Sequence, residues 1–165
     1  MKRELMIYFE NNQEKVAVTY KLEMLVRRAI EATLDNECYG NACEVSVTFT
    51  DNEGIRELNR RFRKLDKPTD VLSFPLFDYD GTSGEPPVDE LCPMLGDIVL
   101  SLEMAEAQGA EFGHGTVREV AFLTVHSMLH LLGYDHETGE EDENEMRARQ
   151  REVMERLGLG ISEEA

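Results

Sequence analysis

Two spacings of apolar residues alternate along the chain, and they predict strands and helices in turn. In residues 44–50, EVSVTFT, apolar and polar residues alternate, which places the apolar side chains on one face of a strand. Shorter apolar runs predict further strands at residues 4–9, 70–76 and 95–100. Pro75 has no amide hydrogen to donate, so we expect its strand to lie at a sheet edge or to end there.

Apolar residues spaced by three or four predict helices between and after these strands. The expected helices cover residues 20–34, 51–63, 101–112, 116–132 and 140–158. Asp51, Ser101 and Thr116 are expected at N-caps, because their side-chain oxygens can accept a backbone N–H of the first turn. The helix over residues 116–132 is the most apolar and is expected at the centre. The pattern indicates an α/β fold, with a mixed sheet of roughly four strands packed with about five helices.

Length and composition favour one domain without disulfides. A chain of 165 residues with 41% hydrophobic residues can bury a core unaided, so residues 1–165 are expected to form a single domain. The three cysteines are odd in number and lack CxxC spacing, which predicts free thiols. Apolar runs of signal-peptide or membrane-spanning length are missing, which predicts a cytoplasmic protein with no membrane partner. The Gly- and Pro-rich residues 78–93 are expected to form a loop.

Charge argues against nucleic acid as a partner globally but not locally. The formal net charge is −17, whereas proteins that bind nucleic acid usually carry a basic surface. Residues 137–145 are mostly acidic, and six cations gather within one predicted helix and the turn after it: Arg56, Arg60, Arg61, Arg63, Lys64 and Lys67. Local attraction of RNA to this basic segment remains possible, and the alternative is that both runs are solvated surface.

Three of the four histidines have the spacing of a metal site. Residues four apart lie on one face of a helix, so His126 and His130 can present two imidazoles to one ion. Gly133 can take the left-handed conformation that ends a helix and returns His136 toward that ion. Three protein ligands leave a coordination position open, which is typical of catalytic zinc. The alternative is unrelated core histidines. His114 lacks this spacing and is expected to be a solvated turn residue.

The pattern HxxxHxxGxxH is shared with metzincin metalloproteases, in which a glutamate after the first histidine serves as general base. Ser127 occupies that position here and cannot supply a carboxylate. A metallopeptidase is therefore an alternative hypothesis to a metal-dependent hydrolase of another class.

Three blocks together closely resemble the YbeY family of bacterial endoribonucleases that mature ribosomal RNA. They are LNRRFRKLDKPTDVLSFP at residues 58–75, LGDIVLS at residues 95–101 and HSMLHLLGYDH at residues 126–136. Their order and spacing are specific to that family, whereas the first fifty residues and the last helix match only in layout. Family members commonly have glycine where Ser127 stands, which affects packing on that helix face.

The resemblance implies a metal-dependent endonuclease, with zinc as the usual metal. The implied substrate is single-stranded RNA, in maturation of the 3′ end of 16S ribosomal RNA and in ribosome quality control, with the small subunit and assembly factors as partners. A ribosome-assembly factor without catalytic activity is a further hypothesis. His126, His130 and His136 match the family's motif histidines, and Phe62 with Arg63 matches its aromatic–arginine pair.

Two roles follow from side-chain chemistry. A guanidinium such as that of Arg63 suits the charge that develops on phosphate during cleavage. Asp97 or Asp135 could orient a ligand imidazole through its second nitrogen, or both could be ordinary turn or capping residues.

Overall fold

A four-stranded mixed sheet organises the computed structural model, which describes residues 3–76, 92–134 and 139–160. The strands are β1 (Leu5–Asn11), β2 (Cys43–Thr50), β3 (Val71–Pro75) and β4 (Met94–Ser101). Their order is β1-β2-β4-β3, in which β1, β2 and β4 run parallel and β3 pairs antiparallel with β4. Pro75 is the last residue of edge strand β3, as the sequence predicted.

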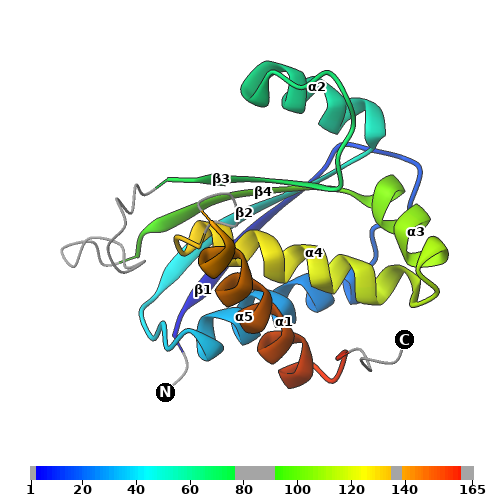
Figure 1. The fold of residues 1–165 in the computed structure, drawn as a ribbon. Helices are drawn as coiled ribbons and strands as arrows, with labels where there is room; N and C mark the ends of the chain where they lie inside the picture. Colours follow the sequence, from blue (N-terminus) through cyan, green and yellow to red (C-terminus); the bar gives the residue numbers. More distant parts are fainter. Residues whose placement is uncertain (1–2, 77–91, 135–138, 161–165) are drawn as a thin grey trace.

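Helices cover the two faces of this sheet unequally. They are α1 (Tyr20–Asn36), α2 (Asn52–Arg63), α3 (Leu102–Glu111), α4 (Gly115–Leu131) and α5 (Glu140–Arg156). Figure 1 shows α1, α4 and α5 on one side of the sheet and α2 on the other. No helix in the three described ranges is long and apolar enough to cross a membrane.

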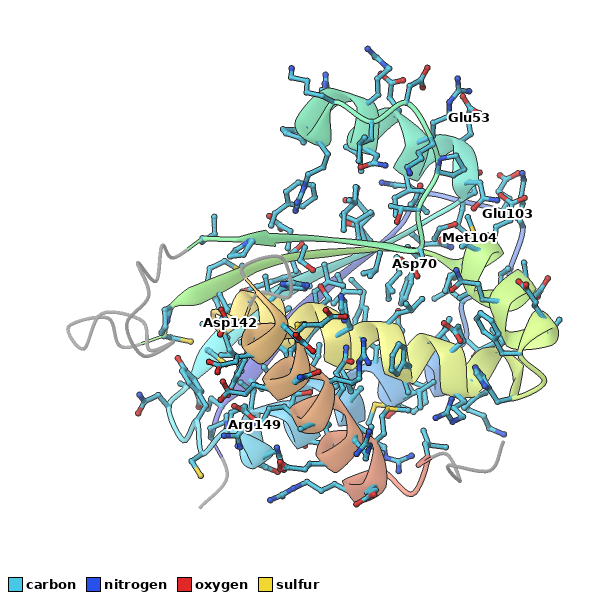
Figure 2. All side chains as sticks on the ribbon, viewed as in Figure 1. Glu53, Asp70, Glu103, Met104, Asp142 and Arg149 are labelled. Carbon is cyan, nitrogen blue, oxygen red and sulfur yellow. The ribbon has the colours of Figure 1, made fainter. Side chains whose placement is uncertain are left out.

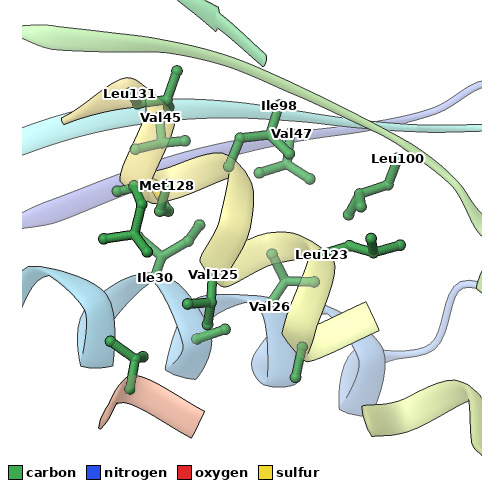
Figure 3. Packing of buried hydrophobic residues seen from close by; sticks show 14 of the residues in the cluster. Val26, Ile30, Val45, Val47, Ile98, Leu100, Leu123, Val125, Met128 and Leu131 are labelled. Atoms are coloured by element: carbon green, nitrogen blue, oxygen red, sulfur yellow. The ribbon is translucent and has the colours of Figure 1, made fainter. Parts of the chain in front are cut away.

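The main core lies between the sheet and helices α1 and α4. Buried side chains from the strands, such as Val47 and Ile98, meet Ile30 of α1 and Val125 and Met128 of α4 (Figure 3). The predicted central position of the most apolar helix is confirmed, because α4 contacts the sheet, α1, α3 and α5. A second, smaller cluster lies under α2 and joins one helix to two strands: Ile55, Leu72 and Val99.

Two of the three predicted N-caps are confirmed. The Asp51 side chain accepts from the amide of Gly54 at 2.9 Å, and the Ser101 side chain accepts from the amide of Met104 at 3.2 Å. Thr116 as an N-cap is wrong, because α4 begins at Gly115 and His114 precedes it without a side-chain cap bond. Most of the loop predicted at residues 78–93 lies outside the described residues.

His114 is not the solvated turn residue that the sequence suggested. Its Nε2 lies 2.8 Å from Oε2 of Glu119, a carboxylate that is buried one turn into α4. A buried carboxylate needs such a partner, since burying it unpaired is costly. The turn that brings the imidazole back contains two glycines in the left-handed region, Gly113 and Gly115.

A glycine in β4 lets the last turn of α4 approach the sheet closely. Gly96 has φ +152°, and a Cβ built on it would lie 2.4 Å from the backbone oxygen of Phe74 and 2.8 Å from Cδ2 of Leu131. It lies where the pairing of β2 with β4 shifts register, between Glu44 and Val45. Any larger side chain would push β3 or the end of α4 away.

Candidate functional site

The two helical histidines meet through their ε nitrogens. His126 and His130 lie one turn apart near the end of α4, with 3.2 Å between their Nε2 atoms. Their ring centroids are 4.7 Å apart and the rings are nearly perpendicular, at 78°. The prediction that these two imidazoles share one helix face is confirmed.

We call Nδ1, the ring nitrogen that does not face the other histidine, the rear nitrogen. In His130 it is held by the turn that ends the helix. Gly133 has φ +103°, so the prediction that it takes the left-handed conformation is confirmed. The turn brings the backbone oxygen of Tyr134 to 2.9 Å from Nδ1 of His130. A carbonyl oxygen only accepts hydrogen bonds, so Nδ1 carries the proton and the neutral ring keeps its lone pair on Nε2.

The rear nitrogen of His126 is held by α5. The side-chain nitrogen of Gln150 hydrogen-bonds Nδ1 of His126, and Gln150 is itself buried, with 7% of its surface exposed. Sequence analysis missed this residue. The signal was present, because Gln150 interrupts an otherwise apolar stripe of α5 between Met146 and Val153.

Tyr134 is fixed from a third helix. Its hydroxyl donates to Oε1 of Glu37, the residue that caps the C-terminus of α1, at 2.5 Å. Burial and this hydrogen bond raise the pKa of Tyr134, which keeps the phenol protonated as a donor. Arg149 of α5 lies 4.0 Å from the Glu37 carboxylate, and Figure 2 shows it about midway along that helix. Helices α1 and α5 therefore both support the histidine turn.

A chain of contacts links the predicted arginine to the histidine helix. Arg63, the last residue of α2, donates to the backbone oxygen of Ser73 in β3 at 2.9 Å, and its Cζ lies 5.9 Å from the ring centroid of Phe74. The Ser73 hydroxyl is 2.6 Å from that of Ser127, next to His126 in α4. The three sequence blocks identified above thus meet at edge strand β3.

Ser127 is buried and engaged in that hydrogen bond, so it does not replace the missing carboxylate of a metzincin. The Ser73–Ser127 contact was also missed from the sequence, since neither serine has a spacing that indicates a partner 54 residues away. Asp97 lies in β4 opposite Phe74, and the contacts described above assign the rear ring nitrogens to Tyr134 and Gln150.

The basic segment on α2 is partly neutralised by neighbouring acids. Arg56 pairs with Asp66 at 2.9 Å and Arg60 pairs with Glu57, and these hydrogen bonds raise the pKa of both guanidinium groups. Three further cations on the same helix and the turn after it are exposed: Arg61, Lys64 and Lys67. The end of α2 that carries Arg63 is therefore a positively charged surface on an otherwise acidic protein.

The geometry of the two histidines fits two ligands of one ion. Two ligand atoms on a tetrahedral zinc ion, each about 2.0–2.1 Å from it, lie about 3.3 Å apart, and the two Nε2 atoms are 3.2 Å apart. Among the described residues no group of three or more His, Cys, Asp or Glu side chains could hold a metal. His136 and Asp135 lie outside the described residues, so the third ligand stays a prediction.

Comparison with known proteins identifies close relatives. A sequence model of the family described as Endoribonuclease YbeY matches residues 8–158. A protein named Endoribonuclease YbeY from Caldanaerobacter subterraneus subsp. tengcongensis is 54% identical over 157 residues, covering 93% of this chain and 98% of the relative. A protein of the same name from Clostridium botulinum is 45% identical over 166 residues, covering 93% of this chain and 99% of the relative. The solution structure of TM1509 from Thermotoga maritima matches with a TM-score of 0.61 and 30% identity, covering 93% of this chain and 90% of that one.

Proposed function

The chain belongs to the Endoribonuclease YbeY family and is an endoribonuclease, and we propose that it cleaves single-stranded ribosomal RNA with the help of one zinc ion. The observation that carries the metal proposal is the histidine pair. Two Nε2 atoms face one another at 3.2 Å, while both Nδ1 atoms are hydrogen-bonded from behind. Nδ1 of His130 donates to a backbone carbonyl, which is the usual second contact of a zinc-ligating histidine.

In this proposal His126, His130 and His136 hold the metal. Three neutral imidazoles suit zinc better than magnesium or calcium, which prefer oxygen ligands. When bound, such an ion polarises a phosphate oxygen or lowers the pKa of a water molecule. His130 contributes a lone pair on Nε2, because Tyr134 holds the ring proton on the opposite nitrogen.

Arg63 is the proposed phosphate contact. Its bond to the Ser73 backbone oxygen fixes the guanidinium at the edge of β3, and a guanidinium carries five N–H donors, so donors remain for phosphate oxygens. A planar, permanently charged group is well suited to the charge that builds up on phosphorus-bound oxygens during cleavage. The hydrogen bonds through Ser73 and Ser127 keep β3, and with it Arg63, in register with the histidine helix.

The substrate proposal is single-stranded RNA of the small ribosomal subunit, at the 3′ end of 16S ribosomal RNA, in the cytoplasm. The exposed cations of α2 support it, because they offer phosphate contacts beside Arg63. A nearby aromatic ring, Phe62, is 57% exposed and packs edge-on against Phe74 at 5.4 Å, which suits stacking with an unpaired base. Bases in a duplex are already stacked and do not reach such a ring.

The test is cleavage of one defined RNA as a single strand and as a duplex, before and after dialysis against a chelator. We expect cleavage of the single strand, loss of cleavage after chelation and recovery on adding one equivalent of zinc. His130→Ala prepared in parallel controls for contaminating nucleases. Undiminished cleavage by the dialysed protein, or cleavage by the variant equal to that of the wild type, would show that the activity does not come from this site.

A further inference from the structure

The two histidines differ in what holds them, and the difference rests on a single side chain. Nδ1 of His130 faces a backbone carbonyl, which can only accept. Nδ1 of His126 faces the amide of Gln150, which presents an acceptor oxygen or a donor nitrogen depending on which way the amide is turned. The tautomer of His130 is therefore fixed, whereas that of His126 depends on Gln150.

With the amide nitrogen of Gln150 toward His126, as in the structure, Nδ1 of His126 is the acceptor and its Nε2 carries the proton. That proton can then be donated to Nε2 of His130 at 3.2 Å, and the histidine pair is closed by its own hydrogen bond. With the amide oxygen toward His126, Nδ1 carries the proton instead. The lone pairs of the two Nε2 atoms are then directed toward each other across 3.2 Å, and a cation between them would be attracted by both.

We propose that Gln150 is a positioning residue whose amide selects the tautomer of His126, and that the oxygen-inward orientation is the one that leaves the lone pair of Nε2 for a metal ion. This inference rests on the proposed metal site. The two orientations differ by a rotation about the last side-chain bond, and an amide has nearly the same shape in both. No backbone movement of α5 is needed.

The surrounding contacts restrict this freedom to Gln150. Helix α5 is anchored beside the site by Met146 and Val153, both buried in the main core. Its neighbour Arg149 lies 4.0 Å from Glu37, which in turn holds the Tyr134 hydroxyl. The amide thus projects from a fixed helix toward one imidazole, while the other imidazole is held by a turn that is itself hydrogen-bonded.

Two substitutions separate the role in tautomer selection from packing. Gln150→Glu places only acceptor oxygens toward Nδ1 of His126, so it favours the tautomer with a free lone pair on Nε2. Gln150→Leu fills the same buried space but offers no hydrogen bond. Gln108→Leu removes an amide from α3, at the other end of α4, and serves as the control.

The experiment measures zinc affinity by competition with a chelator. We expect Gln150→Leu to bind zinc about 10-fold to 100-fold more weakly than the wild type. Gln150→Glu should bind at least as tightly as the wild type, and Gln108→Leu should be unchanged. Thermal unfolding of each zinc-free variant is measured beside it, so that a loss of fold is recognised and kept apart from a loss of ligand orientation.

Long-range proton–nitrogen correlation spectra of the histidine rings give a second readout, independent of activity. In zinc-loaded wild-type protein, His126 should carry its proton on Nδ1. In Gln150→Glu the proton should be on Nδ1 before zinc is added. His130 should carry its proton on Nδ1 in every sample.

Each result has a distinct meaning. Equal zinc affinity in Gln150→Leu and wild type, or equal weakening by the leucine and glutamate variants of normal stability, overturns the positioning role while the metal site stands. A proton on Nε2 of His126 in zinc-free Gln150→Glu overturns the selection of the tautomer by this side chain. Failure of the wild type to bind zinc overturns the metal site itself, and this inference with it.

Discussion

The two faces of the sheet differ in how many of the described helices cover them. On one face α4 and α1 pack against the strands, α5 packs over both, and the histidine pair is held by contacts from all three helices. On the other face α2 is the only helix of the described ranges that packs, over a small cluster of Ile55, Leu72 and Val99. The larger of the two buried clusters therefore lies on the face that carries the histidines.

The contrast fits the proposal that one face holds the metal ligands and the other contacts the phosphates of the substrate. Ligands for a metal must be held within tenths of an ångström, and this requires a well-packed surrounding that fixes each rotamer. Contacts to the phosphates of a flexible single strand tolerate more movement, because long charged side chains adjust to the backbone. We call the face covered by α1, α4 and α5 the thick side and the face covered by α2 the thin side. Arg63 is on the thin side, but its hydrogen bond to Ser73, which in turn contacts Ser127 of α4, fixes it relative to the thick side.

The largest expected effect comes from removing a histidine on the thick side. His130→Ala should abolish both metal binding and RNA cleavage, because two remaining imidazoles hold zinc poorly. The matched control is His114→Ala, at the N-terminal end of the same helix, which should keep its metal. Elemental analysis and cleavage of a single-stranded RNA measure both. Equal loss of metal in the two variants would refute the ligand assignment.

On the thin side, we expect Arg63→Ala to lower the single-turnover cleavage rate by about 100-fold to 1,000-fold, as for removal of a donor to a developing negative charge. Metal content and thermal stability should stay near those of the wild type. Arg63→Lys should recover only part of the rate, since lysine keeps the charge without the paired planar donors.

Arg60 provides the comparison for this prediction, because it is exposed on the same helix and pairs with Glu57. Arg60→Ala should weaken RNA binding slightly and reduce the slope of log affinity against log salt by about one phosphate contact. If Arg63→Ala behaved in the same way, with an unchanged single-turnover rate, Arg63 would be an ordinary surface cation.

The packing of the two faces is compared by the same substitution on each. Ile30→Ala and Ile55→Ala each delete a fully buried side chain, at a cost of about 2–5 kcal/mol. We expect Ile30 to be near the upper end and Ile55 near the lower end, because a small cluster relaxes more easily. Native-state hydrogen exchange should show local loss of protection in α2 for Ile55→Ala and a global loss for Ile30→Ala.

The smallest effect concerns Cys43, whose thiol is buried in the main core. Burial raises the pKa of Cys43 to about 11, whereas an exposed thiol ionises near 8.5. Its contribution to stability is present below the unfolded-state pKa and is lost as pH rises toward the folded-state value. Denaturant unfolding at pH 8 and pH 10 should therefore show a steeper fall for the wild type than for Cys43→Ala. An equal fall in the free energy of unfolding for the two proteins would mean that burial does not raise the pKa of Cys43.

Local patterns predicted most of the secondary structure. The alternation in β2, the caps Asp51 and Ser101 and the edge position of Pro75 all depend on residues within a few positions of one another. Thr116 was predicted as an N-cap because threonine is a common cap residue near the start of a helix. In the structure α4 begins one residue earlier, and His114 before it contacts buried Glu119. No local pattern in the sequence indicates that contact.

The contacts around the histidines were harder to predict. His126, His130 and Gly133 are arranged by helix geometry alone, so their spacing was sufficient. Gln150 and Glu37 reach the site only because α5 and α1 dock where they do, and docking is decided by the apolar faces of whole helices. Their polar side chains carry no local mark of a partner across the fold.

The close approach at Gly96 has a consequence for how this protein tolerates mutation. The position touches neither RNA nor metal in any role described above, yet a side chain there would displace Leu131, the residue directly after His130, or the backbone of Phe74, directly after Ser73. In a scan of all single substitutions, Gly96 should therefore rank with the histidines for loss of function. An inventory restricted to residues that contact the substrate would overlook it.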